Sequence, residues 1–243
     1  MRILAIGAHP DDLEIFAYGT LSAWAAMGAL LTLCVATDGA RGGSLPPDVL
    51  RRLRAAETAA ALAPLGFGPP RNLGFADGGL RADAALEAAL AALIDETCPD
   101  LLLTHAPNDY HRDHRALSAA ALQAAGFSVP VLFMDTMNGT GFVPTHWVDV
   151  TGQWAAKETA ILAHATQDPA RFVTIANRQA AFRAGECNGP PEARAEAFRF
   201  EPRFPFADIR AFLPPAPPAR PIGHRGKGRA IAQFSGSAPP AGV

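Results

Sequence analysis

Short apolar runs alternate with longer alanine-rich segments of helical period along most of this chain. The apolar runs predict strands at 2–7, 30–36, 72–74, 100–104, 129–135 and 145–150. The intervening segments predict helices at about 18–27, 47–65, 82–97, 114–125, 153–164 and 169–184. Such alternation is typical of βαβ units, in which helices cover both faces of a parallel sheet. We therefore predict a Rossmann-like, doubly wound α/β fold with a mostly parallel sheet in one main domain.

The composition divides the chain into this domain, at 1–212, and a tail at 213–243. Apolar residues make up 49% of the 243 residues, which is enough for a sizeable core. From residue 213 the chain is rich in Pro, Gly, Ala and Ser, and its Arg and Lys residues face no acidic neighbours. This composition predicts a disordered tail, with a basic docking segment as the alternative.

Charge and hydropathy exclude several kinds of partner. The net charge is −2 and basic residues are mixed with acidic ones through most of the chain, so we expect no nucleic-acid partner. The uncharged stretch 21–37 is short for a membrane helix and contains Gly28, and no charged leader opens the chain. We expect a cytoplasmic protein without a membrane partner; the oligomeric state stays open, with a homo-oligomer among the options.

Two clusters of imidazole and carboxylate groups follow two of the predicted strands. The first is the run AHPDDLE at 8–14, after the first strand, and the second is HRDH at 111–114, after the fourth. Ligands of doubly wound sheets bind beyond the carboxyl ends of the strands, where the strand order reverses. In a 3-2-1-4-5 order the first and fourth strands are neighbours, so we expect the two clusters to meet.

The residue types in these clusters predict a hydrolytic metal site. Catalytic zinc takes three protein ligands and leaves a position for water, and His9, Asp12 and His114 meet that requirement. Asp11, next to a ligand, is the candidate general base. A protonated His111 is a candidate for stabilising an oxyanion, with Asp113 fixing its orientation. The same ligands would accept iron(II) or another divalent ion in place of zinc.

With these residues identified, the chain resembles the PIG-L/LmbE family of zinc-dependent N-deacetylases. The family hallmarks, AHPDDxE near the N-terminus and a later HxDH, are intact at 8–14 and 111–114. Further matching patches extend the resemblance over about 2–200: TDG at 37–39, RxxE at 54–57, GFADG at 74–78, EAFR at 196–199, and Asp149, Lys157, His164 and Gln167.

The resemblance implies the same roles for the two clusters, namely His9, Asp12 and His114 as metal ligands, Asp11 as base and His111 at the oxyanion. It also implies that Arg54 and Asp77 contact a sugar-like substrate, a small-molecule amide of glycoconjugate type. Lys157 and His164 are seven residues apart and would share one helix face, so we expect the pair to bind substrate at the pocket rim.

The chain departs from the family pattern at two places. The usual glycine-rich continuation after the first motif is replaced here by Ile15-Phe16-Ala17-Tyr18-Gly19, which leaves the ligands untouched and predicts a reshaped pocket floor. Arg112 stands where Pro is commoner, a change that the site should tolerate.

Structural interpretations compete with the functional ones at several positions. Arg54 and Glu57 could form only a surface ion pair on a helix, Asp77 could be only the first residue of a turn, and Lys157 could be an exposed helix lysine. His105, at the end of an apolar strand, is expected to be structural.

Three functions therefore follow from the sequence. The first is removal of an N-acyl group, acetyl above all, from an amino-sugar-containing molecule. The second keeps the metal and replaces the substrate with a non-sugar acylated amine. The third is a Rossmann-like binding protein in which the clusters only cap helices; it predicts no bound metal, although the absence of G-x-G-x-x-G after the first strand argues against a dinucleotide.

Overall fold

The computed structural model describes residues 1–224 and 227–229. Within these residues, seven strands form one sheet in the order β3-β2-β1-β4-β5-β7-β6. The first five run parallel to one another, and β7 is antiparallel to both of its neighbours. The strands are β1 (Arg2–Gly7), β2 (Leu30–Thr37), β3 (Arg71–Phe75), β4 (Leu101–Thr104), β5 (Val131–Met134), β6 (His146–Asp149) and β7 (Ala195–Phe200). The predicted Rossmann-like, mostly parallel α/β sheet is confirmed.

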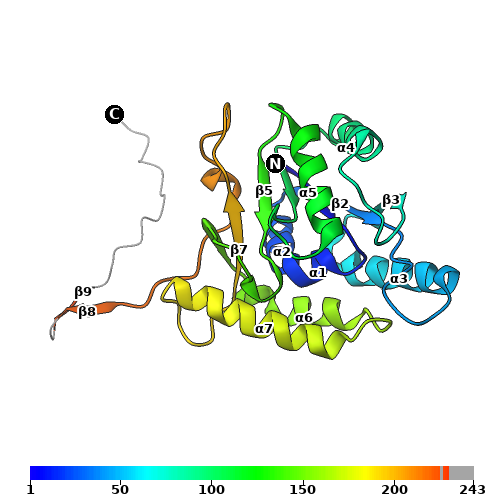
Figure 1. Cartoon of the computed structure of the whole chain (residues 1–243). Helices are drawn as coiled ribbons and strands as arrows, with labels where there is room; N and C mark the ends of the chain where they lie inside the picture. Colours follow the sequence, from blue (N-terminus) through cyan, green and yellow to red (C-terminus); the bar gives the residue numbers. More distant parts are fainter. Residues whose placement is uncertain (225–226, 230–243) are drawn as a thin grey trace.

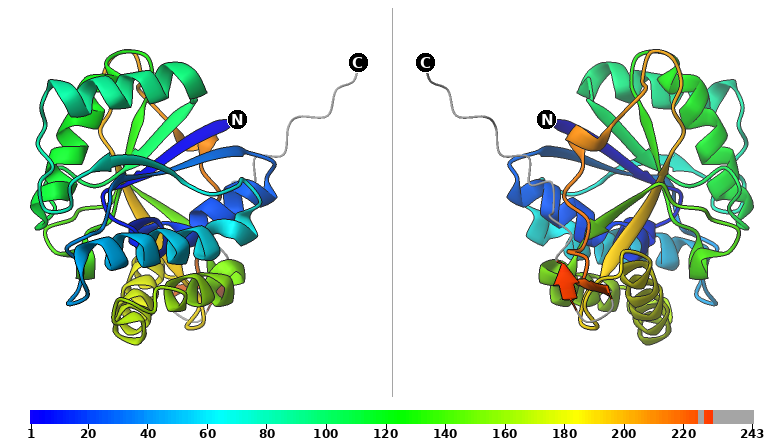
Figure 2. Two further views of the ribbon diagram at one scale, coloured as in Figure 1. Left: turned by 90° about the vertical axis from the view of Figure 1, so that its right-hand side faces the viewer. Right: turned by 90° about the vertical axis from the view of Figure 1, so that its left-hand side faces the viewer.

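Helices pack on both faces of the sheet (Figures 1 and 2). Because successive side chains of a strand point to opposite faces, Ile3 and Ala5 of β1 join one apolar cluster, and Leu4 and Ile6 join the other. The first cluster lies under α1, α2 and α6, and the second under α4 and α5. The helices are α1 (Asp12–Phe16), α2 (Tyr18–Ala26), α3 (Pro47–Leu62), α4 (Ala84–Thr97), α5 (Arg112–Ala125), α6 (Trp154–Leu162) and α7 (Pro169–Glu186).

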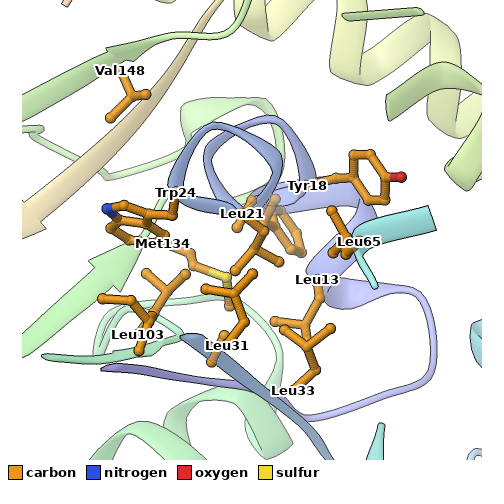
Figure 3. Packing of buried hydrophobic residues seen from close by; sticks show 14 of the residues in the cluster. Leu13, Tyr18, Leu21, Trp24, Leu31, Leu33, Leu65, Leu103, Met134 and Val148 are labelled. Atoms are coloured by element: carbon orange, nitrogen blue, oxygen red, sulfur yellow. The ribbon is translucent and has the colours of Figure 1, made fainter. Parts of the chain in front are cut away.

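Trp24 of α2 anchors the first cluster. It is fully buried and lies with Met134 and Leu103 of the central strands (Figure 3). Its indole Nε1 donates a 2.7 Å hydrogen bond to the carbonyl oxygen of Phe212, which ties the segment after β7 to the domain.

Replacing Trp24 with alanine should lower the free energy of unfolding by about 3–5 kcal/mol, since the change opens a large cavity in a packed core. Leu30 is 61% exposed, and Leu30→Ala should change stability by less than about 0.5 kcal/mol. Urea unfolding of both variants measures the difference. Equal losses would show that the α2 face is not a tightly packed core.

Strand β7 is the main element that the sequence analysis missed. It lies inside the sheet, between β5 and β6, although its sequence AEAFRF contains Glu196 and Arg199. Glu196 is buried because Lys157 of α6 pairs with it. A strand whose buried positions include a charged residue does not show the usual apolar pattern. The five-residue α1 was also missed, since it is too short to display a helical period.

About half of the predicted tail at 213–243 lies outside the described residues. In its described part, residues 213–221 run along the domain: Asp149 N–H donates to Pro215 O at 2.8 Å, and Arg220 N–H donates to Asn188 O at 2.8 Å. Beyond them, β8 (Ile222–His224) pairs antiparallel with β9 (Lys227–Arg229). Among the helices of the described residues, none combines the length and the apolar character that crossing a bilayer requires.

Candidate active site

The two polar clusters converge at the carboxyl ends of β1 and β4. These strands are neighbours, with Ala5 opposite Leu103, so the loops that leave them lie side by side. As a result His9 Nδ1 lies 3.2 Å from His114 Nε2, although the two residues are 105 positions apart. Helices α6 and α7 lie side by side at one end of the molecule, and both contact α1, which follows the first cluster (Figure 1).

His9, Asp12 and His114, the predicted metal ligands, lie close together. The Asp12 carboxylate lies 3.5 Å from His9 Nδ1 and 3.4 Å from His114 Nε2, and the two imidazole nitrogens are 3.2 Å apart. Ligand atoms about 2.0–2.1 Å from a common tetrahedral centre are about 3.3 Å from one another. The three side chains are therefore close enough to share one ion, with His9 facing Oδ2 of Asp12 and His114 facing Oδ1. Other groups with metal-holding spacing overlap this one: His114 also groups with His9 and His111, and with Asp12 and His105.

The remote nitrogens of both imidazoles face carboxylates. His9 Nε2 lies 3.3 Å from Asp77 Oδ1 and 3.3 Å from Asp113 Oδ2, and His114 Nδ1 lies 3.1 Å from Asp109 Oδ2. Metal-binding histidines usually direct their second nitrogen in this way, which fixes the ring and raises its basicity. Sequence analysis missed Asp109, although a carboxylate five residues before a candidate ligand, in the loop after the same strand, is a usable signal.

His105 also belongs to this cluster. It is fully buried, its Nε2 lies 3.0 Å from Asp12 Oδ2, and its ring stacks on that of His114 at a centroid distance of 3.6 Å. His105 therefore contacts two of the predicted ligands, and with Asp12 and His114 it also forms a group that could itself hold a metal ion.

The electrostatic field of the cluster favours positive charge. Burial lowers the pKa of His9, but Asp113, Asp12 and Asp77 outweigh it and raise the pKa to about 12. Burial also lowers the pKa of His114, but Asp12 and Asp109 outweigh it and raise the pKa to about 9. A site that holds protons this strongly also attracts a divalent cation, which would take their place on the imidazoles.

Asp11 lies beside the candidate ligands and is held by Arg54. The Arg54 guanidinium is 3% exposed; its Nη2 donates to Asp11 Oδ2 at 3.1 Å and to Pro10 O at 2.6 Å, and its Nη1 donates to Gly39 O at 3.1 Å. Asp11 has a φ of +120°, a strained value for a residue with a side chain. Burial raises the pKa of Asp11 to about 6, although Arg54 opposes the rise.

The structure thus places Arg54 against Asp11 at the edge of the cleft, and the alternative surface pair with Glu57 is not formed. Glu57 instead accepts hydrogen bonds from the backbone N–H and the hydroxyl of Thr166, at 2.8 and 2.6 Å. Asp77 likewise does more than begin a turn, because it faces His9 and accepts the Arg41 N–H at 2.9 Å.

His111 differs from the sequence expectation in its protonation. Its Nδ1 accepts the backbone N–H of Asp113 at 3.2 Å, so that nitrogen carries no proton and a neutral ring has its proton on Nε2. Burial and the neighbouring His114 and His9 lower the pKa of His111. Both observations favour a neutral His111 as hydrogen-bond donor over the protonated imidazole expected from the sequence. The Asp113 backbone fixes the tautomer, while its carboxylate faces His9 and accepts the Gly78 N–H at 2.7 Å.

Lys157 and His164 lie inside the protein and do not line the cleft. Lys157 Nζ is 2.5 Å from Glu196 Oε1, and Glu196 also accepts two backbone N–H groups at the start of α2. His164 Nε2 lies 3.0 Å from Glu14 Oε1, and both side chains are buried. The predicted rim contacts are therefore not formed, because both polar groups already face carboxylates in the interior.

A cleft of about 350 Å³ opens over the cluster. Its polar wall contains the candidate ligands, Asp11 and His111, and its apolar wall contains Ile15, Phe16, Met137 and Phe172. A cleft of this size with a few convergent polar groups is typical of a small-molecule site.

The sequence relationships agree with this geometry. The model of the PIG-L family, described as GlcNAc-PI de-N-acetylase, matches residues 4–125, which include both clusters. This chain belongs to the PIG-L family. A relative from Mycolicibacterium smegmatis, 1D-myo-inositol 2-acetamido-2-deoxy-alpha-D-glucopyranoside deacetylase, is 31% identical over 232 residues, covering 68% of this chain and 80% of the relative. The resemblance stated from the motifs is therefore confirmed.

Solved structures share the fold of this PIG-L protein. N,N'-diacetylchitobiose deacetylase from Pyrococcus horikoshii superposes with a TM-score of 0.73 at 23% identity, covering 82% of this chain and 83% of that one. The 4-carboxy-2-hydroxymuconate hydratase GalB from Pseudomonas putida also superposes with a TM-score of 0.73, at 22% identity, covering 83% of this chain and 97% of that one. One fold thus serves a deacetylase and a hydratase, so the reaction has to be argued from the site.

Proposed function

We propose that this PIG-L protein is a metal-dependent hydrolase that removes an N-acyl group, acetyl above all, from a small amino-sugar-containing molecule. The observation that carries the proposal is the 3.2–3.5 Å spacing of His9, Asp12 and His114, with the unligated carboxylate of Asp11 beside them. Three ligands and one free carboxylate are the groups that metal-assisted amide hydrolysis needs.

A divalent ion bound by these three residues would polarise the amide carbonyl and acidify the attacking water. Zinc suits two imidazoles and a carboxylate, and iron(II) is an alternative.

Asp11 acts as the general base in this proposal. Its carboxylate accepts the proton of the attacking water and then delivers that proton to the departing amine nitrogen. Arg54 holds the carboxylate through Oδ2, which fixes the direction in which its other oxygen points. As the C–N bond breaks, the products are a free amine and a carboxylate such as acetate.

His111 stabilises the negative charge that develops on the substrate in this proposal. Its Nε2–H donates a hydrogen bond to the oxygen of the amide carbonyl as negative charge develops there. The hydrogen bond from Asp113 N–H to Nδ1 keeps the proton on Nε2, so the donor is in place before the substrate binds.

The amino-sugar assignment is supported by the relatives. The Mycolicibacterium relative is named as a deacetylase of an acetamido-deoxy-glucopyranoside, and it aligns over 80% of its length. Asp77 and Arg41 line the cleft beside the cluster and offer polar groups near a sugar ring. The alternative substrate, a non-sugar acylated amine, remains an outcome of the assay below.

Removal of the metal should abolish activity. We expect dialysis against a chelator to lower kcat/KM on N-acetylglucosaminyl-inositol or N,N'-diacetylchitobiose by at least about 100-fold, because the ion supplies several kcal/mol of transition-state stabilisation. Stoichiometric Zn²⁺ or Fe²⁺ should restore it. Undiminished turnover after complete metal removal would rule out a metal-dependent mechanism, and turnover confined to simple acylated amines would rule out the sugar.

A further inference from the structure

A second cavity adjoins the cleft of the candidate active site. The cleft measures about 350 Å³, and the second, inner cavity measures about 20 Å³. Ile15, Phe16 and Met137 line both, so the two cavities meet at these three side chains. The inner cavity has room for about one water-sized group.

Of these three side chains, Phe16 lies beside the metal cluster. Its ring centroid is 6.2 Å from that of His114 and 5.9 Å from that of His105, with interplanar angles of 88° and 84°. Phe16 ends α1, and Asp12, a candidate ligand, begins this five-residue helix. The ring and the candidate ligand therefore belong to one short helix.

The residues that line the cleft differ in exposure. Tyr110 is 62% exposed and Arg41 is also exposed, whereas Phe16 and Ile15 are only 5% and 7% exposed. The amine part of a sugar conjugate is large and polar, so it suits the exposed part of the lining. The small apolar acyl group suits the buried, apolar part.

We propose that Phe16 limits the length of the acyl group that this enzyme accepts. The proposal rests on the deacylase function above. A methyl group fits against the phenyl ring, whereas a longer chain meets the ring and cannot reach the inner cavity. The four charged side chains around that cavity are already paired, Lys157 with Glu196 and Asp135 with Arg183 at 2.7 Å, so the space behind Phe16 carries no net charge.

The test compares N-acetyl-D-glucosamine with N-butyryl-D-glucosamine. The wild-type enzyme should prefer the acetyl compound, and Phe16→Ala should raise the butyryl-to-acetyl ratio of kcat/KM at least about 10-fold, since loss of the phenyl ring opens space for two methylene groups. Phe16→Leu, which keeps a bulky aliphatic side chain, should raise it less. Phe172→Ala is the matched control, because Phe172 lines the cleft but not the inner cavity.

A binding measurement separates this proposal from the deacylase function. In the Asp11→Asn background, in which turnover should be at least about 100-fold slower, calorimetry gives the Kd of each compound with and without Phe16→Ala. A selective gain in butyryl binding supports the acyl limit even if hydrolysis of both compounds fails, which would overturn the deacylase proposal alone. A ratio unchanged within twofold in both Phe16 variants, or shifted equally by Phe172→Ala, would overturn the acyl limit.

Discussion

The Asp11→Asn variant should retain its metal and lose activity by about 100- to 10,000-fold in kcat, the usual contribution of a general base. Asparagine has the shape of aspartate, and its side-chain oxygen can still accept the Arg54 hydrogen bond now 3.1 Å long. The strained backbone at φ +120° is also preserved, because asparagine tolerates positive φ better than most residues. What the variant lacks is a group that can take a proton from water.

The matched control is Asp83→Asn. Asp83 caps α4 through hydrogen bonds from Ala85 N–H and Leu86 N–H, and asparagine caps helices equally well. We expect this variant to keep full activity and stability. Steady-state kinetics and metal analysis on both variants decide the matter: Asp11→Asn with wild-type kcat would exclude Asp11 as the base, and Asp11→Asn without metal would make it a ligand.

The Lys157→Met variant should lose about 3 kcal/mol of unfolding free energy, because it leaves Glu196 buried without its cation. Lys157 is 2% exposed and Glu196 is 5% exposed. The carboxylate also accepts two backbone N–H groups at the start of α2, so the pair joins α6, β7 and α2. The double variant Lys157→Met/Glu196→Gln should recover about half of the lost unfolding free energy, because a neutral amide costs less to bury than a carboxylate.

The exposed pair Arg71–Glu96 is the control for Lys157→Met. It has a similarly short N–O distance of 2.6 Å, but its side chains are 47% and 58% exposed. Arg71→Met should therefore cost less than about 1 kcal/mol. Urea unfolding of the four proteins gives the comparison. Similar losses for Lys157→Met and Arg71→Met would show that burial adds nothing to the Lys157–Glu196 pair.

Topology explains why so much of the candidate site could be predicted. The clusters at 8–14 and 111–114 each follow an apolar strand, and the reversal of strand order between β1 and β4 is a property of doubly wound sheets. Ligand chemistry then restricts which side chains can share one ion. Asp11 and His111 lie near the predicted ligands because they belong to the same two clusters.

The remaining residues depend on contacts that no local pattern shows. From the sequence alone, Lys157 is expected on the exposed face of an amphipathic helix. Its burial follows only once β7 is known to place Glu196 opposite it. The tautomer of His111 follows from one backbone N–H, and the role of Arg54 follows from the path of the loop around Pro10. Each of these depends on the packing of loops from distant parts of the chain, which strand and helix periodicity does not encode.

The most direct test of the account is anomalous diffraction from crystals of the metal-loaded protein. The account predicts one peak per chain, about 2.0–2.2 Å from His9 Nδ1, a carboxylate oxygen of Asp12 and His114 Nε2. A peak bound by other residues, or none in protein saturated with Zn²⁺ and with Fe²⁺, would contradict it.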